Sequence, residues 1–296
     1  MIRFLLKPES ILLLAAAIWG LGWMPLQHLS GLGLRGMPVV LATYGLLCVV
    51  AVPILLWQRR AWWPQRYALL AIAVFGGWAT AGLVGALSEG EVVRAMLLFY
   101  LAPVWAMLGG WLLLGERLTL LRVGALVLAM LGIGLTLGVS RDSFSAFGSS
   151  DWLALSAGLA FALNNLATRH AEQIPLASKA VVAFIGSALL AWLFCLAEGS
   201  SVPPMDAFTW AKIALFGVFW LLAMGAAQYG FTHVEASRAA VLAVIELVAA
   251  VLSSAWFGDR ELGLREWCGG ALVLVAALIA ARPPREPSLI SCEASR

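Results

Sequence analysis

Charged residues are scarce in this chain of 296 residues: only 12% are Asp, Glu, Lys or Arg, against about 25% in an ordinary soluble domain. Hydrophobic residues make up 62%, which is more apolar surface than a water-soluble protein of this length can bury in one core. The net charge of +3 is small and the basic residues are scattered, which argues against a nucleic-acid partner. The composition therefore indicates an integral membrane protein, with lipid as its solvent.

Motifs typical of several enzyme classes are also absent. No G-x-x-x-x-G-K-[ST] loop is present, so the chain has no nucleotide-driven motor of its own, and no H-E-x-x-H pattern indicates a metalloprotease. The four cysteines form no C-x-x-C pair, which argues against a disulfide framework or a zinc site. We therefore expect no enzyme, no cofactor and no metal, and energy for any transport must come from solute or ion gradients.

Long apolar runs are what the sequence offers instead. A helix needs ~20 apolar residues to cross the hydrocarbon core, and ten such runs are present. The predicted spans are 10–29, 38–57, 66–87, 92–114, 119–138, 151–169, 176–197, 207–230, 236–257 and 264–281. The first run is too long for the apolar region of a signal peptide, so it is interpreted as an uncleaved span.

The distribution of lysine and arginine orients these spans, because cytoplasmic loops carry an excess of both residues. Thirteen of the 19 basic residues fall on the side that holds the two termini and the loops after spans two, four, six and eight. The sequence therefore predicts that both termini lie in the cytoplasm.

The two halves of the chain resemble each other at positions that follow the same order. Trp19 corresponds to Phe161, His28 to His170, Phe75–Trp78 to Phe216–Trp220, Glu91–Ala95 to Glu235–Ala239, and Gly115-Glu116-Arg117 to Gly258-Asp259-Arg260. Matches in one order at a nearly constant spacing indicate an internal repeat. We assign residues 1–145 to a first five-helix repeat and 146–282 to a second, and we expect a short disordered cytoplasmic tail at 283–296.

Five spans are an odd number, so the second repeat must cross the membrane in the opposite sense to the first. Inverted repeats can exchange conformations, which makes outward-open and inward-open states nearly equal in energy, as alternating access requires. The sequence therefore predicts an all-α integral membrane protein with ten transmembrane helices, as two inverted five-helix repeats around a central cavity. A single chain is sufficient for a carrier of this kind, whose partners are lipid and a small solute; a channel is an alternative.

Several of these stretches resemble the drug/metabolite transporter superfamily, of the EamA type. The resemblance is carried by Trp19-Gly20, by Leu101-Ala102-Pro103-Val104-Trp105-Ala106, and by Leu114-Gly115-Glu116-Arg117-Leu118 followed by Gly124. Glu246 stands in the place of the family's Glu-Pro pair, although Leu247 replaces the proline, and the second Gly-Glu is altered to Gly258-Asp259. The resemblance implies a non-ATP transporter with this fold.

The stretch from Gly90 to Trp105 is similar to the bacterial aromatic amino acid and methyl viologen exporters. This closer resemblance implies a bacterial cytoplasmic membrane protein that exports amino acids, aromatic or large neutral ones. The export of other small metabolites or of quaternary ammonium drugs by the same fold is the alternative.

Glu246 is the clearest candidate for contact with a solute, because a charged side chain in the middle of a span costs roughly 2.5–3.5 kcal/mol. No basic residue stands near it in the sequence. It can anchor a substrate amine or carry a coupling proton. The alternative is a neutral glutamic acid that is hydrogen-bonded to a neighbouring helix.

Other polar and aromatic residues lie deep in the predicted spans. The further candidates for substrate binding are Gln228, Asn164, Asn165, Trp19, Tyr44, Trp78, Tyr100, Trp105, Trp220 and Arg94. Trp220, Met224 and Gln228 share one helical face, which predicts an apolar wall that ends in an amide. For each aromatic ring, stacking on a solute competes with helix packing, and Arg94 either meets a substrate carboxylate or extends to the interface.

Overall fold

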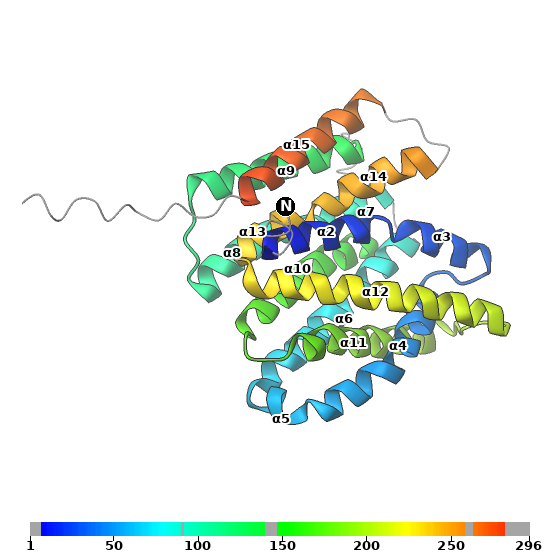
Figure 1. Ribbon diagram of the computed structural model, residues 1–296. Coiled ribbons are helices and arrows are strands. Elements are labelled where there is room, and N and C mark those ends of the chain that lie inside the picture. Colours follow the sequence, from blue (N-terminus) through cyan, green and yellow to red (C-terminus); the bar gives the residue numbers. More distant parts are fainter. Residues whose placement is uncertain (1–6, 90–91, 140–146, 258–262, 282–296) are drawn as a thin grey trace, which may run out of the picture.

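The computed structural model describes residues 7–89, 92–139, 147–257 and 263–281, and the regular elements in these ranges are helices. In chain order they are α2 (Pro8–Gly20), α3 (Trp23–Gly31), α4 (Met37–Trp57), α5 (Arg59–Trp62), η1 (Trp63–Gln65), α6 (Arg66–Glu89), α7 (Val92–Phe99), α8 (Ala102–Leu114), α9 (Leu120–Leu137), α10 (Ser149–His170), α11 (Leu176–Glu198), α12 (Ala207–His233), α13 (Ala236–Ala243), α14 (Ile245–Phe257) and α15 (Leu264–Ala281) (Figure 1). The tail predicted at 283–296 and the stretch Gly258-Asp259-Arg260 lie outside the described residues.

Each of the ten predicted spans coincides with one helix or with two short helices that follow each other directly. Among the described residues, eight helical stretches are long and apolar enough to cross a membrane. The other two are the first segments of the two halves. The first is divided between α2 and α3 at Leu21–Gly22, and α10 carries Asp151, Asn164 and Asn165, which make it less apolar. The prediction of an all-helical membrane protein is confirmed.

Spans four and nine are each interrupted near their middle. α7 ends at Phe99 and α8 begins at Ala102, with Pro103 in the first turn of α8. Proline has no backbone N–H for the preceding turn, and its ring collides with the carbonyl four residues earlier, so the helix breaks there. α13 ends at Ala243 and α14 begins at Ile245 without any proline at the break.

The most extensive helix contacts join the first half of the chain to the second. α6 packs against α10, α4 against α11, α9 against α15, and α2 against α12. Figure 1 shows α9 beside α15 at one side of the molecule and α11 beside α4 at the other. Two inverted five-helix repeats that interleave around a pseudo-two-fold axis produce this pairing.

Two glycines let the first helix of each half approach the interrupted span of the other half. A Cβ atom on Gly20 of α2 would overlap the carbonyl oxygen of Glu246, and a Cβ on Gly158 of α10 would overlap that of Phe99. Only glycine permits backbones to come so close. Phe99 and Glu246 also line one shared small cavity, so the two breaks meet inside the molecule.

Candidate functional site

A cavity of about 310 Å³ lies between the two halves. Its wall is largely aromatic and contains Trp19, Tyr44, Phe99, Phe161, Phe184, Phe216, Trp220 and Phe231. The rings of Trp19 and Trp220 are stacked with their centroids 6.0 Å apart, and those of Tyr44 and Phe184 are stacked at 5.4 Å. A cavity of this size and composition suits a small solute that carries an apolar ring.

Several polar atoms in the cavity wall have no protein partner. Trp19 Nε1, Thr43 Oγ1, Asn164 Oδ1 and Gln228 Oε1 are buried and make no hydrogen bond within the described part of the chain. Buried polar atoms in folded proteins are nearly always hydrogen-bonded. These four atoms are therefore free to bind the polar end of a solute.

Other polar groups of the wall are used by the protein itself. The Thr80 hydroxyl donates to the Gly76 carbonyl at 3.1 Å, as a hydroxyl in an apolar helix commonly does. Trp220 Nε1 donates to the Tyr44 hydroxyl at 2.8 Å, which links α12 of the second half to α4 of the first. This link holds the two rings in place in the wall.

Glu246 lies in the first turn of α14, directly after the break in span nine. Its carboxylate interacts with the hydroxyl of Tyr100, which lies at the break in span four. Glu246 lines the main cavity and also the small cavity between the two breaks. The pair therefore joins the two halves at the one place where both spans are interrupted.

The ionisable groups of this cavity are of one sign only. Among the described residues that line it, Glu246 is the only carboxylate, and none is Lys, Arg or His. An ammonium group can pair with Glu246, whereas a carboxylate can meet only neutral donors. Within the described ranges, no group of three His, Cys, Asp or Glu side chains is placed to hold a metal ion.

The structure brings six of the eleven predicted site residues together on the cavity wall. These are Trp19, Tyr44, Asn164, Trp220, Gln228 and Glu246. Met224 lines the cavity too, so Trp220, Met224 and Gln228 lie on one face of α12, toward the cavity. Two more of the predicted residues, Tyr100 and Asn165, line the small cavity beside Glu246.

Trp78, Trp105 and Arg94 make other contacts. Trp78 Nε1 donates to the Ser156 hydroxyl at 3.1 Å, and Trp105 packs against a cluster of alanines between α8, α10 and α13. Arg94 forms an ion pair with Asp151, with 2.8 Å between Nε and Oδ1. None of the three is among the residues that line the main cavity.

Three polar residues of the wall, Thr43, Thr80 and Ser187, are not among the residues predicted from the sequence, and Thr43 differs from the other two. Its hydroxyl is buried without a partner among the described residues and lies on the cavity. Threonine is common in apolar helices and usually bonds to its own helix backbone. No signal in the sequence separates Thr43 from Thr80, whose hydroxyl does bond to the backbone of its own helix.

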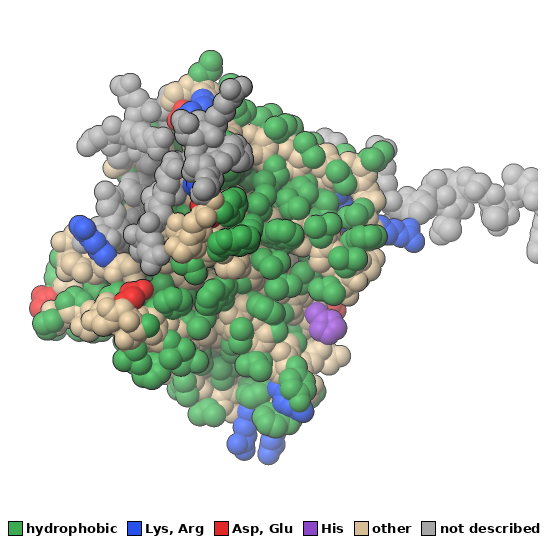
Figure 2. Space-filling model, turned by 180° about the vertical axis from the view of Figure 1, so that it is seen from behind, with side chains coloured by type: hydrophobic (Ala, Val, Ile, Leu, Met, Phe, Trp, Pro, Cys, Tyr) green, Lys and Arg blue, Asp and Glu red, His purple; other side chains and the backbone are tan. Residues whose placement is uncertain are grey.

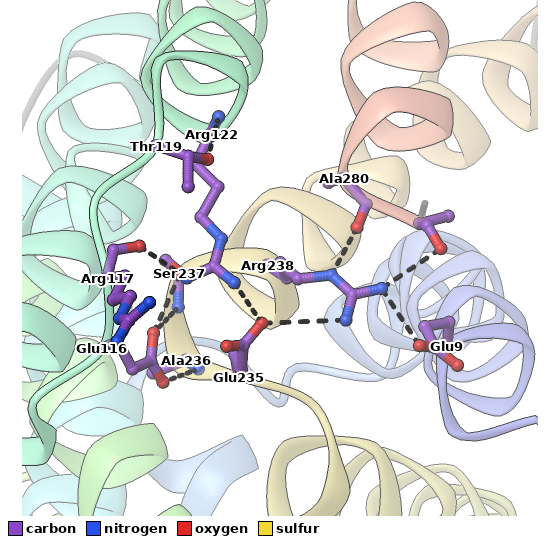
Figure 3. Close-up of polar contacts among 11 residues, drawn as sticks. Glu9, Glu116, Arg117, Thr119, Arg122, Glu235, Ala236, Ser237, Arg238 and Ala280 are labelled. Carbon is purple, nitrogen blue, oxygen red and sulfur yellow. Dashed lines mark hydrogen bonds and ion pairs between the residues drawn. The ribbon is translucent and has the colours of Figure 1, made fainter. Parts of the chain in front are cut away.

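A polar network lies at the end of the molecule where α12 ends and α13 begins (Figure 3). The Glu116 carboxylate, in the loop after α8, accepts hydrogen bonds from Ala236 N at 2.6 Å, from Ser237 N at 3.2 Å and from Ser237 Oγ at 2.9 Å. Backbone N–H groups at a helix N-terminus attract an anion. Glu116 therefore caps α13 from a different part of the chain.

Arg238 extends this network to the ends of two further helices. Its Nη2 atom lies 3.0 Å from Glu9 at the start of α2, and its Nε atom donates to the Ala280 carbonyl in α15 at 2.7 Å. Glu235 lies 3.8 Å from Nη1 of Arg238 and also pairs with Arg122 of α9. Figure 3 shows these groups converging from several helices.

The cavity extends toward the opposite end of the molecule. α4 contributes to the wall with residues of its first two turns, from Val39 to Tyr44, and α6 contributes residues up to Leu87, close to its end. Glu235 and Arg238 lie where α12 ends and α13 begins, with the start of α2 and the end of α15. The network therefore lies at the end away from the first turns of α4 and the last turns of α6.

An ion pair equivalent to Arg238–Glu9 occurs near the other end. By the internal repeat, Arg94 corresponds to Arg238, and Asp151 holds the place of Glu9 at the start of the first helix of its half. Arg94 and Asp151 are paired and buried. Both ends of the molecule thus use an arginine from an interrupted span and an acid from the first helix of the opposite half.

Comparison with known proteins agrees with this architecture. The sequence pattern of the EamA-like transporter family matches residues 6–138 and 148–282. An uncharacterized transporter of Pseudomonas aeruginosa is 29% identical over 223 residues, which cover 72% of this chain and 70% of that protein. An uncharacterized transporter of Archaeoglobus fulgidus is 29% identical over 236 residues, covering 74% and 77%. A protein of known crystal structure has the same fold, with a TM-score of 0.74, 19% identity, and coverage of 93% of this chain and 95% of that one.

Proposed function

We propose, from the premise that this chain belongs to the EamA-like transporter family of the drug/metabolite transporter superfamily, that it exports aromatic or large neutral amino acids across a bacterial cytoplasmic membrane. Membership of the family makes it a membrane transporter. The observation that supports the proposed solute is one cavity that combines an aromatic wall, a single carboxylate and unpartnered neutral donors and acceptors.

Each part of a zwitterionic amino acid has a partner in this cavity. The ammonium group pairs with Glu246, at about twice the strength of a neutral hydrogen bond. The side-chain ring packs against the aromatic wall, which includes Trp19, Trp220 and Phe184. The carboxylate receives hydrogen bonds from Trp19 Nε1 and Thr43 Oγ1, which have no protein partner in the described chain.

Transport by this chain proceeds by alternating access. The polar network of Glu9, Glu116, Arg122, Glu235 and Arg238 closes one end, while the cavity extends toward the other. The excess of Lys and Arg supports a cytoplasmic position for the network end. The buried Arg94–Asp151 pair is its counterpart at the other end, and alternating access requires the two ends to open in turn.

The experiment is uptake by the purified chain in proteoliposomes, with labelled phenylalanine and tryptophan as solutes. Uptake should exceed that of empty vesicles, should saturate, and should show counterflow when the vesicles are preloaded with unlabelled phenylalanine. No excess over empty vesicles for either amino acid, in a preparation that transports another solute, would overturn the proposed substrate. Uptake without saturation at channel-like rates would overturn the carrier mechanism.

A second class of solute is favoured by the absence of Lys, Arg and His from the described wall of the cavity. An aromatic amine or a quaternary ammonium compound needs a partner for its cation and none for a carboxylate. Phenylalanine, phenylalanine amide and phenethylamine share the ring and the ammonium group. They differ at the third position, which holds a carboxylate, a neutral amide or only hydrogen. If the amide and the amine compete for counterflow better than phenylalanine, organic cations are the preferred solutes of this site.

A further inference from the structure

The segment from Trp57 to Tyr67 joins α4 to α6 and contains the short helices α5 and η1. Within these eleven positions are three arginines and four aromatic residues: Arg59, Arg60, Arg66, Trp57, Trp62, Trp63 and Tyr67. Figure 1 places α5 at one edge of the molecule, and Figure 2 shows Lys and Arg side chains at the corresponding lower edge. A turn between two spans does not by itself need this composition.

The three arginines of the segment are exposed and have no carboxylate partner among the described residues. Five other arginines of the protein are used differently. Arg94, Arg122, Arg169, Arg238 and Arg265 each form an ion pair with an acidic side chain. Within the described residues, the one hydrogen-bond acceptor of the guanidinium groups of the segment is the Tyr67 hydroxyl, to which Arg66 Nη2 donates at 3.3 Å. Their other N–H donors are available to an anion that the protein does not supply.

Three of the four aromatic side chains of the segment are exposed. Trp57 is 83% exposed, Trp63 59% and Tyr67 72%. The Arg66 guanidinium lies 4.6 Å from the centroid of the Tyr67 ring and 5.4 Å from that of Trp63. Arg66 Nη2 also donates to the Tyr67 hydroxyl, and the remaining N–H groups of this guanidinium can donate to a phosphate.

Exposed tryptophan and tyrosine rings are typical of the headgroup level of a bilayer, where one end of the ring is apolar and the other wet. Trp62 is turned inward instead, and its Nε1 atom donates to the Leu55 carbonyl at 2.8 Å. This bond holds the segment against the end of α4. The arginines are therefore presented at the depth of lipid phosphates.

The equivalent connection of the second half differs in its central part. Residues 58–65, between α4 and α6, contain Arg59, Arg60, Trp62 and Trp63, whereas residues 199–206, between α11 and α12, contain no Lys, Arg or aromatic residue and end in Asp206. The first turns of α12 do carry Phe208 and Lys212, whose ammonium lies 4.6 Å from the Phe208 ring centroid. The adjacent arginines Arg59 and Arg60 therefore distinguish the first connection from the second.

We propose that the Trp57–Tyr67 segment binds the phosphate of anionic phospholipid headgroups, such as phosphatidylglycerol, in the adjacent leaflet. Arg59 and Arg60 supply charge, and Arg66 supplies an oriented guanidinium. The segment continues into α4 and α6, which both line the cavity, and Gln58 accepts a hydrogen bond from Ser178 of α11 at 2.6 Å. Bound lipid thereby holds the α4–α6 pair at a fixed height in the membrane.

The test is equilibrium binding of phosphatidylglycerol and phosphatidylcholine to the purified full chain in detergent, measured by native mass spectrometry. The wild-type protein should prefer phosphatidylglycerol. Each basic side chain near an anionic lipid surface is worth about fivefold in affinity, so R59Q/R60Q should lower phosphatidylglycerol affinity roughly twentyfold and Arg66→Gln about fivefold. Neither change should alter phosphatidylcholine binding.

The matched control is R35Q/R117Q, which removes the same charge at two exposed arginines outside the segment. It should retain the preference for phosphatidylglycerol. Equal preference of the wild type for both lipids, an equal loss in R35Q/R117Q, or unchanged affinity in both segment variants would overturn the proposal. Intrinsic fluorescence during heating verifies that each variant is folded, and the readout is independent of the transported solute.

Discussion

Spans four and nine occupy equivalent places in the two repeats, and each is broken where a glycine of the opposite half packs against it. Their breaks arise differently. Pro103 interrupts span four, whereas span nine breaks at Val244 without a proline. The side chains at the two breaks also differ, because Tyr100 stands at the first and Glu246 follows the second. The repeat thus duplicates the backbone geometry, while only one copy carries the charge that can bind a cation.

The largest effect is expected from Glu246→Gln, which removes the charge from the one break that has it. A charged hydrogen bond contributes about 1.5–3 kcal/mol, so transport of solutes with an ammonium group should fall roughly tenfold to a hundredfold. Any pH dependence of wild-type transport that comes from Glu246 should disappear. Initial rates of counterflow in proteoliposomes between pH 5 and 8 measure both effects.

Tyr100→Phe serves as the control for that variant, since it keeps the carboxylate and removes only the hydroxyl at the other break. It should reduce transport less than Glu246→Gln and preserve the response to pH. Kinetics of Glu246→Gln that match the wild type at every pH would mean that Glu246 serves helix packing alone.

Gly20→Ala and Gly158→Ala test the close backbone contact that spans four and nine have in common. The added methyl group would overlap the carbonyl oxygen of Glu246 in the first variant and of Phe99 in the second. Overpacking of this kind costs typically about 1–3 kcal/mol, and we expect similar losses at the two equivalent sites. Thermal unfolding in detergent, followed by intrinsic fluorescence, measures them.

Gly124→Ala provides the matched change, because nothing lies within 4 Å of a Cβ at that helical position. Its unfolding temperature should stay at or slightly above that of the wild type, since alanine favours a helix. A loss at Gly20 or Gly158 no larger than at Gly124 would show that the backbones can separate without cost.

Glu116→Gln examines the start of span nine, where the carboxylate caps α13. Loss of the charge should weaken the closed network by about 1 kcal/mol and so open that end roughly fivefold more often. In a background without the native cysteines, a cysteine in place of Ala240 should react correspondingly faster with a membrane-impermeant maleimide added from the network side.

The matched variant here is Glu172→Gln, which removes a more exposed carboxylate that is paired with Arg169. It should leave the labelling rate unchanged. Equal acceleration in the two variants would attribute the effect to net charge, and no acceleration in Glu116→Gln would remove this residue from the closed end.

The smallest effect concerns another equivalent pair, the starts of α6 and α12. Asp206 accepts a hydrogen bond from Thr209 N at 3.0 Å at the start of α12, whereas α6 has no acidic residue in its first turn. Hydrogen bonds from Thr209 lower the pKa of Asp206. Its folded pKa therefore lies below its unfolded one, so the stabilisation is present at neutral pH and is lost as the pH falls through the folded pKa.

Asp206→Ala should accordingly lower the unfolding temperature slightly at pH 7, and the difference from the wild type should shrink toward pH 3. Asp206→Asn keeps an acceptor for the Thr209 N–H, so its unfolding temperature at pH 7 should lie between those of the wild type and Asp206→Ala. A difference that is constant with pH would show that the carboxylate charge contributes nothing to the cap.

The sequence predicted the membrane spans well, because about twenty apolar residues are both necessary and recognisable for a helix in lipid. It also predicted the face of Trp220, Met224 and Gln228, since helical spacing alone places them on one side. It failed to separate Asn164 from Asn165. Adjacent residues point about 100° apart on a helix, and the first lines the main cavity while the second lines the small one.

Sequence alone determined that the chain is a ten-segment membrane protein with two related halves, because hydropathy and internal repetition are properties of order along the chain. Which deep side chains face the cavity was decided only by tertiary structure. Trp78 and Trp220 stand at equivalent places in the repeat, yet Trp78 bonds to Ser156 and Trp220 lines the cavity. Lipid solvates every apolar surface equally well, so the apolar character of a side chain does not show whether it faces the cavity or the lipid. Which side chains face the cavity depends on how the opposite half packs.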